Sequence, residues 1–425
     1  MSFKPKINAF QIKKAFNYVN IANGMYTLFT IKRYIEQIIM FPFILIGNLI
    51  ARFSPLKQEY DVFLFFPGYT IGGAERVNAE ILKCLDDKKV MVFFTKHSAN
   101  QGMLHFFQLP HVAWRDISRW TDNKWMYWGN LIFRGICSAY INRQKKKPTV
   151  FIGQCNFGYK LTPHLQRNIA IHELIHMVDP KFNWVWGPFI QFIDTRILVG
   201  DVFIEKFADL YKTMGIPEKY TQRFKKIVYR LEYIPEKATP RHFSLPLRVY
   251  YAGRGGHQKR IHLLVEIIRH CRELSLPIEF HLAGSFASEL PQNLIDDGTY
   301  VGELQGGEAI YAFHRSHDIL LMTSAFEGFP LVIMEAMAFG AIPLVPAIDA
   351  IPEHIRTCEN GYLLPNATDE AVLINDAVER LRYLTTHREE LPGVSSKAYA
   401  YAQTAFSAER FRKAYREVIL NEQFA

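Results

Sequence analysis

Cysteine is scarce in this sequence, and its placement excludes two common kinds of scaffold. Five cysteines are spread over 425 residues without the short spacing of a zinc or redox motif. An odd, scattered set also argues against a disulfide framework, so we expect reduced thiols in a cytoplasmic protein. The amino terminus lacks a compact apolar stretch followed by a small-residue cleavage site, and we therefore expect no secretory signal.

Charged residues are also few, and the most apolar segment is too short to cross a bilayer as a helix. Charged residues make up 21% of the chain and apolar residues 49%, a balance that favours a folded core over disorder. The segment Ile38–Ala51 has fourteen residues and contains Pro42, whereas a spanning helix needs about 20 apolar residues. The whole chain is long enough for two domains.

Positive charge, by contrast, is concentrated around this apolar segment. Residues 1–60 contain eight Lys or Arg against two Glu, and so carry +6 of the formal +9. A basic, apolar helix or hairpin is typical of a segment that lies on an anionic membrane surface. The alternative is a helix that covers an apolar patch of the protein's own body. We predict a membrane-associating segment over 1–57 and a peripheral location on the inner face of the membrane, without a nucleic-acid partner.

Two series of strand-like runs alternate with helical patterns, which predicts two α/β domains with parallel sheets. The first series is DVFLFF, VMVFFT, TVFIG, NIAIH and RILVG, at residues 61–66, 90–95, 149–153, 168–172 and 196–200. The second series is LRVYYAG, IEFHLAG, DILLMTS and AIPLVP, at residues 247–253, 278–284, 318–324 and 341–346. Three prolines in residues 235–247 indicate a linker, and one long helical pattern over 395–420 ends the chain.

The stretch SAFEGFPLVIMEAMAFG, residues 324–340, follows a predicted strand and opens a predicted helix. Pro330 suits the first helical position, and Gly340 suits the carboxyl cap. Amides exposed at a helix start bind phosphate, and the Glu327 carboxylate nearby can accept hydrogen bonds from sugar hydroxyls. The alternative is that Glu335 lies on a solvated helix face and Glu327 only neutralises the helix dipole.

Two glycine-containing turns follow strands in the same way. In YYAGRGGHQKR, residues 250–260, Arg254 and Lys259 would hold a diphosphate, although a surface loop with solvated charges is the alternative. A dinucleotide motif is not indicated, because Gln258 stands at the third glycine position. In PGYTIGGAERV, residues 67–77, adjacent glycines allow close approach of a ligand, but the lysine and hydroxyl of a P-loop are lacking.

The pentapeptide HELIH, His172–His176, matches the H-E-x-x-H pattern of zinc metalloproteases. A zinc site needs both histidines on one helix face, together with a third ligand. Residues 168–172 alternate like a strand, and Pro180 shortens any helix that begins later. A zinc hydrolase is therefore retained only as an alternative.

Three of these motifs together resemble GT-B-fold glycosyltransferases of the retaining family 4 type, also called glycosyl transferases group 1. GGAERV at 72–77 resembles the family's glycine loop, GRGGHQK at 253–259 its G-R-x-x-x-x-K motif, and EGFPLVIME at 327–335 its E-x7-E signature. The match extends from about residue 60 to residue 420. The chain departs from the family pattern in the linker RLEYIPEKATP and in AIDAIPE, residues 347–353, where a glycine pair is frequent.

The resemblance implies two doubly wound Rossmann-like domains that face each other across a cleft. We predict an acceptor domain over 58–238, a nucleotide-sugar domain over 239–400, and a carboxyl-terminal helix over 401–425 that packs toward the amino domain. The implied donor-binding residues are Gly72, Gly73, Gly253, Arg254, Lys259, Glu327, Gly328, Phe329, Pro330, Leu331 and Glu335. The implied catalytic residues are His172, Arg254, Lys259 and Glu327.

Within this resemblance His172 is a cleft histidine at the end of an amino-domain strand, and His176 is structural. The implied reaction is retaining, hexosyltransferase-like transfer of a sugar from a nucleotide-diphosphate sugar to a glycan or lipid-linked acceptor in polysaccharide or lipopolysaccharide-type synthesis. No metal or further cofactor is expected, because fixed cations and helix amides can stabilise the leaving diphosphate. Besides the zinc hydrolase, the alternative is a non-catalytic, membrane-bound module that binds nucleotide sugars.

Overall fold

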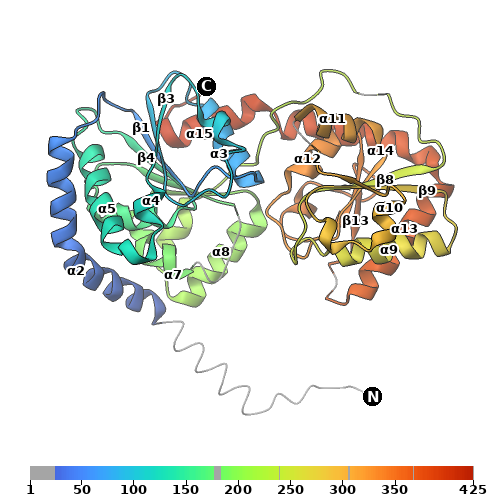
Figure 1. The fold of residues 1–425 in the computed structure, drawn as a ribbon, viewed down its shortest axis with the longest axis horizontal. Helices are drawn as coiled ribbons and strands as arrows, with labels where there is room; N and C mark the ends of the chain where they lie inside the picture. Colours follow the sequence, from blue (N-terminus) through green and yellow to red (C-terminus); the bar gives the residue numbers. More distant parts are fainter. Residues whose placement is uncertain (1–23, 177–182, 239, 305–306, 367, 425) are drawn as a thin grey trace, which may run out of the picture. The chain divides into compact units, whose positions relative to one another are not determined.

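The computed structural model describes residues 24–176, 183–238, 240–304, 307–366 and 368–424 (Figure 1). Contacts divide the chain into two compact units. Unit 1 comprises the described residues up to Leu198, then Val202–Ile227 and the end of the chain from Arg412. Unit 2 comprises Val199–Asp201 and Val228–Phe411. Residues 1–23 of the predicted membrane segment, and Pro180, lie outside the described residues.

Unit 1 is built on a seven-stranded parallel sheet in the order β3-β2-β1-β4-β5-β6-β7. Of the apolar runs predicted as strands, Val62–Phe66 and Val90–Phe94 are buried at every position, because helices cover both faces of such a sheet. The strands are β1 (Val62–Phe66), β2 (Val90–Phe94), β3 (Val112–Asp116), β4 (Thr149–Gly153), β5 (Ile171–Ile175), β6 (Thr195–Leu198) and β7 (Phe224–Lys226).

Helices cover the two faces of this sheet (Figure 1). Phe151 of β4 contacts Tyr415 of α15 on one face, whereas Phe65 of β1 contacts Phe157 of α6 on the other. The helices are α2 (Met25–Phe53), α3 (Gly73–Lys83), α4 (Ser118–Thr121), α5 (Tyr127–Asn142), α6 (Asn156–Leu161), α7 (Asn183–Trp186), α8 (Asp201–Met214) and α15 (Ala408–Leu420).

Helix α2 is longer than the apolar run that was predicted from the sequence. It has 29 residues, continues through Pro42, and by length and composition alone could cross a membrane. One face packs on α5, where Gly47 and Gly135 lie so close that a side chain on either would collide with the other helix. The helix therefore covers the protein's own body, as one of the two alternatives held.

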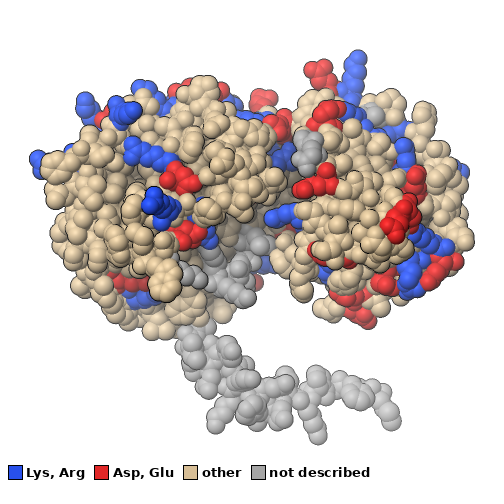
Figure 2. Space-filling model, viewed as in Figure 1, with Lys and Arg blue, Asp and Glu red and all other residues tan. Residues whose placement is uncertain are grey.

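The outer face of α2 is nevertheless apolar. Ile38 is 76% exposed and Phe53 80% exposed. The large exposed apolar residues on this helix, named here the α2 face, are Leu28, Ile31, Tyr34, Ile35, Ile38, Ile39, Phe41, Leu45, Ile46, Leu49, Ile50 and Phe53. In the space-filling view the outer edge along α2 carries few charged side chains (Figure 2).

Unit 2 is built on a six-stranded parallel sheet in the order β10-β9-β8-β11-β12-β13. Its strands are β8 (Leu247–Ala252), β9 (Ile278–Ala283), β10 (Tyr300–Gly302), β11 (Ile319–Leu321), β12 (Ile342–Pro346) and β13 (Tyr362–Leu364). Its helices are α9 (Ile261–Glu273), α10 (Gln292–Asp296), α11 (Gly307–Ser316), α12 (Leu331–Ala338), α13 (Glu370–Thr386) and α14 (Leu391–Ala405).

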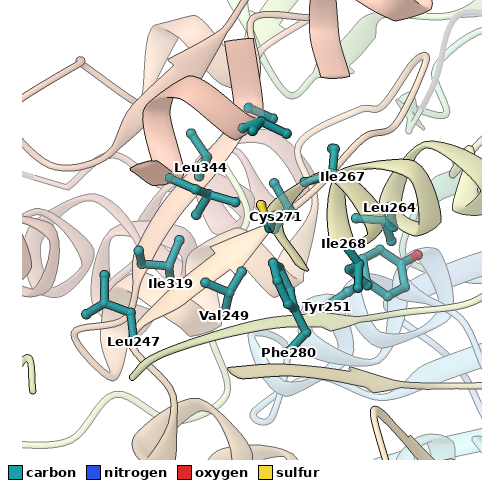
Figure 3. Packing of buried hydrophobic residues seen from close by; sticks show 14 of the residues in the cluster. Leu247, Val249, Tyr251, Leu264, Ile267, Ile268, Cys271, Phe280, Ile319 and Leu344 are labelled. Carbon is teal, nitrogen blue, oxygen red and sulfur yellow. The ribbon is translucent and has the colours of Figure 1, made fainter. Parts of the chain in front are cut away.

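Side chains of α9 pack on the sheet of unit 2 to form its core (Figure 3). Leu264, Ile267 and Ile268 belong to one buried cluster with Val249 of β8 and Phe280 of β9. This packing leaves the loops at the carboxyl ends of the strands free to hold functional groups. The predicted fold class, two parallel α/β units with an added amino-terminal segment, is confirmed.

Two local predictions were wrong. The strand expected at 168–172 begins at Ile171 and runs to Ile175. The single helix expected over 395–420 is two helices, α14 and α15, separated at Phe406 and Ser407. Phe406 is fully buried beside the Phe329 ring, and the Ser407 hydroxyl accepts a hydrogen bond from the Arg410 N–H at 3.3 Å, which starts the next helix.

Candidate active site

The glycine loop of unit 2, residues 253–260, begins where β8 ends. It therefore lies at the carboxyl edge of a parallel sheet, where such folds bind ligands. The Tyr251 hydroxyl donates to the carbonyl oxygen of Arg254 at 2.7 Å, and the Gly256 N–H donates to a Glu289 carboxylate oxygen at 2.7 Å. Gly256 has a φ of 105°, which favours glycine. These bonds fix the loop, while the Arg254 side chain is exposed.

A second loop, residues 322–330, follows the neighbouring strand β11 and is tied to the first. The Ala325 N–H donates to the carbonyl oxygen of Gln258 at 2.8 Å. The Arg260 Nε donates to the carbonyl oxygen of Thr323 at 2.6 Å. Because β8 and β11 are adjacent in the sheet, these bonds hold the two loops together as one structure.

Lys259 and Glu327 meet where the two loops join. The Lys259 Nζ forms a hydrogen-bonded ion pair with Glu327 Oε1, and the Gln258 Nε2 donates to Glu327 Oε2 at 3.3 Å. The two charged side chains are only 16% and 8% exposed, so solvent screens their attraction less than at an open surface. The fold thus brings together two predicted residues that are 68 positions apart in sequence.

Helix α12 holds the second carboxylate of the E-x7-E motif. The helix begins at Leu331, one residue later than predicted, and Pro330 is its cap residue. Glu335 is 3% exposed, which excludes the alternative that it lies on a solvated face. Its Oε2 lies 3.6 Å from Nε2 of His314, and the other ring nitrogen of His314 is hydrogen-bonded to the Tyr250 hydroxyl at 2.5 Å.

The segment between Glu327 and α12 offers the candidate site mainly backbone groups. Phe329, a predicted donor-binding residue, is 2% exposed, and its ring centroid lies 4.1 Å from that of His354. Its side chain therefore belongs to the core. Gly328, just before Phe329, and Leu331, two residues after it, are partly exposed.

Sequence reasoning missed three residues that position this loop pair. Gln258 and Glu289 hold the loops as described, and Asp349 accepts a hydrogen bond from the Glu327 N–H on its Oδ2 at 2.7 Å. Asp349 lies in AIDAIPE, which was noted only as a departure from the family pattern. The position of Asp349 just after the carboxyl end of β12 could have indicated its role, because strands β8, β11 and β12 are neighbours.

HELIH lies on a strand and not on a helix. His172 is the second residue of β5, and His176 follows its last residue. Four residues of extended chain span about 13 Å, whereas zinc binds histidine nitrogens at about 2 Å. In the described part of the chain, no three His, Cys, Asp or Glu side chains are grouped to hold a metal ion. The geometry of a zinc protease is therefore lacking.

The glutamate of HELIH has a structural role. Glu173 forms a hydrogen-bonded ion pair with Arg196 of β6, and the two side chains are 0% and 2% exposed. The guanidinium of Arg196 also donates to the Tyr211 hydroxyl at 2.5 Å and lies 4.4 Å from the Trp186 ring centroid. A carboxylate that is fully buried beside an arginine and aromatic rings is closed to a substrate, so Glu173 does not act as the general base of a protease.

The position predicted for His172 was wrong. It lies near the amino end of β5, whereas His176 lies at the carboxyl end, where its N–H donates to Gln154 Oε1 at 3.1 Å. Burial, with a smaller effect of Lys225, lowers the pKa of His172 to about 4. Burial also lowers the pKa of His176 to about 4, so both imidazoles are neutral at neutral pH.

The remaining predicted residues, Gly72 and Gly73, lie in unit 1. Gly72 caps α3 and Gly73 is its first residue, after the loop that follows β1. They belong to a different unit from Gly253–Lys259 and the E-x7-E motif. A pocket of about 520 Å³ at the ends of α2 and α5 is also in unit 1, and it contains none of the predicted site residues.

The comparison with protein families matches residues 246–382 to glycosyl transferases group 1. This stretch contains both loops, the Lys259–Glu327 pair and Glu335. The solved structure of Anabaena Alr3699/HepE in complex with UDP and glucose superposes with a TM-score of 0.65 at 14% identity, over 85% of this chain and 99% of that one. The chain is a glycosyltransferase with the GT-B fold.

Curated proteins with similar sequences include a synthase and a glycosyltransferase of polysaccharide biosynthesis. A trehalose synthase of Pyrococcus horikoshii is 25% identical over 321 residues, which is 66% of this chain and 72% of the relative. WcaL of Escherichia coli, which bears the name of a colanic acid biosynthesis glycosyltransferase, is 25% identical over 214 residues, or 46% of this chain. The chain spans about half, 51%, of the length of WcaL.

Proposed function

We propose that this glycosyltransferase moves a sugar from a nucleoside diphosphate sugar to a glycan or lipid-linked acceptor, with retention of anomeric configuration. The donor binds unit 2, at the loops that follow β8 and β11. The observation that carries the proposal is the Lys259–Glu327 pair, which places a cation and a carboxylate together at the carboxyl edge of the sheet. The Anabaena protein's complex with UDP and glucose supports a UDP-sugar as the donor class.

In this proposal the leaving diphosphate is stabilised by charge. Arg254 has an exposed side chain, and within the described residues it forms no ion pair. The Lys259 ammonium has three N–H donors, so it can contact Glu327 and a phosphate oxygen together. The first amides of α12 point toward the same edge and add a positive dipole. Such donors act most strongly on the transition state, where negative charge grows on the departing oxygen.

The two carboxylates would hold the donor at different ends. Glu327 accepts hydrogen bonds from hydroxyls of the transferred sugar, and Glu335 accepts them from the ribose. Retention would follow from attack by the acceptor hydroxyl on the face from which the diphosphate departs, with the leaving phosphate receiving the proton. These cations and amides supply the charge that a metal would otherwise supply.

We assign acceptor binding to unit 1, and the synthesis of a polysaccharide or lipopolysaccharide-type glycan as the setting. The name of the Escherichia coli relative, which refers to colanic acid, supports a polysaccharide. His176, at the carboxyl end of β5, replaces His172 as the histidine that contacts the reacting sugars. Its neutral imidazole can accept or donate a hydrogen bond without adding charge.

Thermal unfolding with UDP and without added metal tests the donor site. At about 100 times its dissociation constant, UDP should stabilise the protein by about 2.7 kcal/mol. Lys259→Ala should lose most of this stabilisation, whereas Lys397→Ala, which removes an exposed charge on α14, should keep it. No stabilisation of the wild-type protein by UDP, GDP or ADP would contradict the proposal.

We further propose that the protein lies on the cytoplasmic face of an anionic membrane through the α2 face. Its twelve exposed apolar residues offer the area that burial in the acyl region requires, and residues 1–60 supply a charge of +6. Because the opposite side of α2 packs on α5, the helix would lie in the plane of the interface.

Cosedimentation with anionic vesicles tests this location. A triple variant of the α2 face, Ile38→Glu, Phe41→Glu and Leu45→Glu, should reduce pelleting at both low and high salt, since the apolar contribution is not screened. The matched control introduces three glutamates at exposed apolar positions of unit 2, Leu274, Val301 and Val372. Equal pelleting of the two variants would overturn the membrane proposal.

A further inference from the structure

A small pocket in unit 1 has an unusual charge. Its volume is about 120 Å³, enough for about four waters or one phosphate-sized group. It lies at the carboxyl edge of the sheet, because Thr95 and Lys96 follow β2 and Asn156 follows β4. The lining residues are Thr95, Lys96, Thr121, Asp122, Tyr127, Asn130, Arg134, Asn156, Phe157 and Lys160.

Arg134 is a buried cation that donates hydrogen bonds to neutral side chains. Its side chain is 1% exposed in α5. Its Nε donates to Asn130 Oδ1 at 2.9 Å, one terminal nitrogen to the Met40 sulfur at 3.1 Å, and the other to the Tyr127 hydroxyl at 3.3 Å. Within the described residues no carboxylate forms an ion pair with it. The Glu36 carboxylate of α2 acts on Arg134 from beyond ion-pair distance, and it is paired with Lys32. A buried guanidinium without an ion-pair partner costs several kcal/mol, and an anion in the pocket would offset that cost.

Two further cations line the same space. Lys160 Nζ lies 5.9 Å from the Tyr127 ring centroid, and Lys96 is the second residue after β2. Burial raises the pKa of Tyr127, but the charges of Arg134 and Lys160 outweigh burial and leave the pKa below its ordinary value. Asp122 is the one acidic residue of the lining, and its Oδ2 already accepts a hydrogen bond from the His97 N–H at 3.0 Å.

The lining also has an acceptor that lacks a donor. The Oδ1 of Asn156 is buried, and no described residue donates a hydrogen bond to it. Its counterpart Asn130 is satisfied, since the Asn130 Nδ2 donates to the carbonyl oxygen of Thr121 at 2.7 Å. A ligand hydroxyl beside the anionic group would satisfy Asn156 Oδ1.

We propose that this pocket binds the phosphate group of a phosphorylated saccharide acceptor, with Arg134 and Lys160 on the phosphate and Asn156 on a neighbouring hydroxyl. A phosphate monoester carries about −1.5 to −2 charges at neutral pH, which matches three cations against one carboxylate. That the ligand is the acceptor rests on the proposed function.

The loop that carries Asn156 is hydrogen-bonded to His176. Gln154 stands two residues before Asn156 and accepts the hydrogen bond from the His176 N–H. Gln154 itself has a φ of 47°, a conformation that costs energy for a non-glycine residue and persists where the surroundings hold it. An acceptor anchored by its phosphate would therefore have its hydroxyls at the edge where His176 lies.

Calorimetric titration with inorganic phosphate tests the pocket. Lys259→Ala protein is the background, because it removes the phosphate-binding lysine proposed for unit 2. In this background we expect one phosphate site, weakened about tenfold by Lys160→Gln. Lys212→Gln, the same charge change on an exposed position of α8, is the matched control and should leave the Kd unchanged. Arg134→Gln is avoided, because the residue also supports the packing of α5.

Three outcomes decide between the sources of the phosphate. Glucose 1-phosphate should bind more tightly than phosphate, and Asn156→Ala should abolish the difference. Displacement of phosphate by phosphatidic acid in uncharged micelles, but not by glucose 1-phosphate, would make the ligand a lipid and overturn the saccharide assignment. If the single variant Lys259→Ala no longer binds phosphate, the ion binds at the donor loops and the proposed pocket site is wrong. The thermal unfolding test with UDP reports separately on the proposed function.

Discussion

The HELIH segment of unit 1 and the EGFPLVIME segment of unit 2 are both short motif matches, and their surroundings differ. HELIH lies in the middle of a parallel sheet, where its glutamate is enclosed by Arg196 and aromatic rings. EGFPLVIME lies after β11, at the edge where the loops of neighbouring strands meet. A motif specifies only residue types. To bind or react with a substrate, those residues must also lie at an accessible edge and keep some hydrogen-bonding groups unused by their partners.

The two ion pairs make the same point. Glu173 and Arg196 are almost fully buried, and the Arg196 guanidinium is also bonded to Tyr211. Lys259 retains donors that Glu327 does not use, and its side chain is 16% exposed. Substitutions in the Glu173–Arg196 pair should therefore mainly lower stability. Substitutions in the Lys259–Glu327 pair should mainly lower activity.

The largest expected effect is on stability. Arg196→Met should leave the Glu173 carboxylate buried without a partner and lower the free energy of unfolding by about 3–5 kcal/mol. The double variant Arg196→Met, Glu173→Gln should recover part of this loss, since the uncompensated charge is gone. Urea unfolding followed by circular dichroism measures both. A loss below about 1 kcal/mol for the single variant would mean that solvent reaches the pair.

Next in size is the effect of Lys259→Ala on transfer. Removing a donor to a leaving group should lower kcat about 10²- to 10³-fold at a temperature where the variant is fully folded. The variant should also be less stable, because Glu327 loses its ion-pair partner. Steady-state kinetics with a UDP-sugar donor, with Lys397→Ala as control, measures the change. An activity within twofold of the wild-type value would place Lys259 outside the site.

A third, smaller effect concerns pH and the buried His172. Its pKa of about 4 in the folded protein lies below the ordinary value of 6.5, so the unfolded chain takes up a proton first as the pH falls. Stability from this group is complete above pH 6.5 and is lost toward pH 4, by about 1.4 kcal/mol per pH unit. At pH 5, wild-type protein should therefore have lost about 2 kcal/mol more than His172→Phe, relative to pH 7. Parallel unfolding curves for the two proteins from pH 7 to 5 would show that His172 is solvated.

The smallest effect compares the two histidines of HELIH in catalysis. His176→Ala should lower kcat about threefold to tenfold, as expected for one lost hydrogen bond to a sugar, whereas His172→Ala should act only through stability. Measuring kcat well below the unfolding temperature of each variant separates the two effects. If His172→Ala reduces kcat and His176→Ala does not, the original assignment of His172 is restored.

Much of the architecture could be predicted because it depends on neighbours in the chain. DVFLFF and VMVFFT form buried central strands since continuous apolar runs suit sheets covered on both faces. The glycine turn before α9 and the proline before α12 mark helix starts through local backbone preferences. The break at Phe406 was missed because Ser407 is a weak local signal and the burial of Phe406 beside Phe329 is a long-range contact.

By itself, the sequence determined two parallel α/β units, the loops at the ends of their strands, and the residue types from which we propose a donor site. Only the tertiary structure decided which residues meet. It paired Glu173 with Arg196 across 23 residues and Lys259 with Glu327 across 68, and it gave α2 one face on α5 and one apolar outer face. It also gathered Lys96, Arg134 and Lys160 around one pocket. The physical reason is that periodicity and turn chemistry act over a few residues, whereas burial and charge pairing depend on segments that the folded sheet brings together.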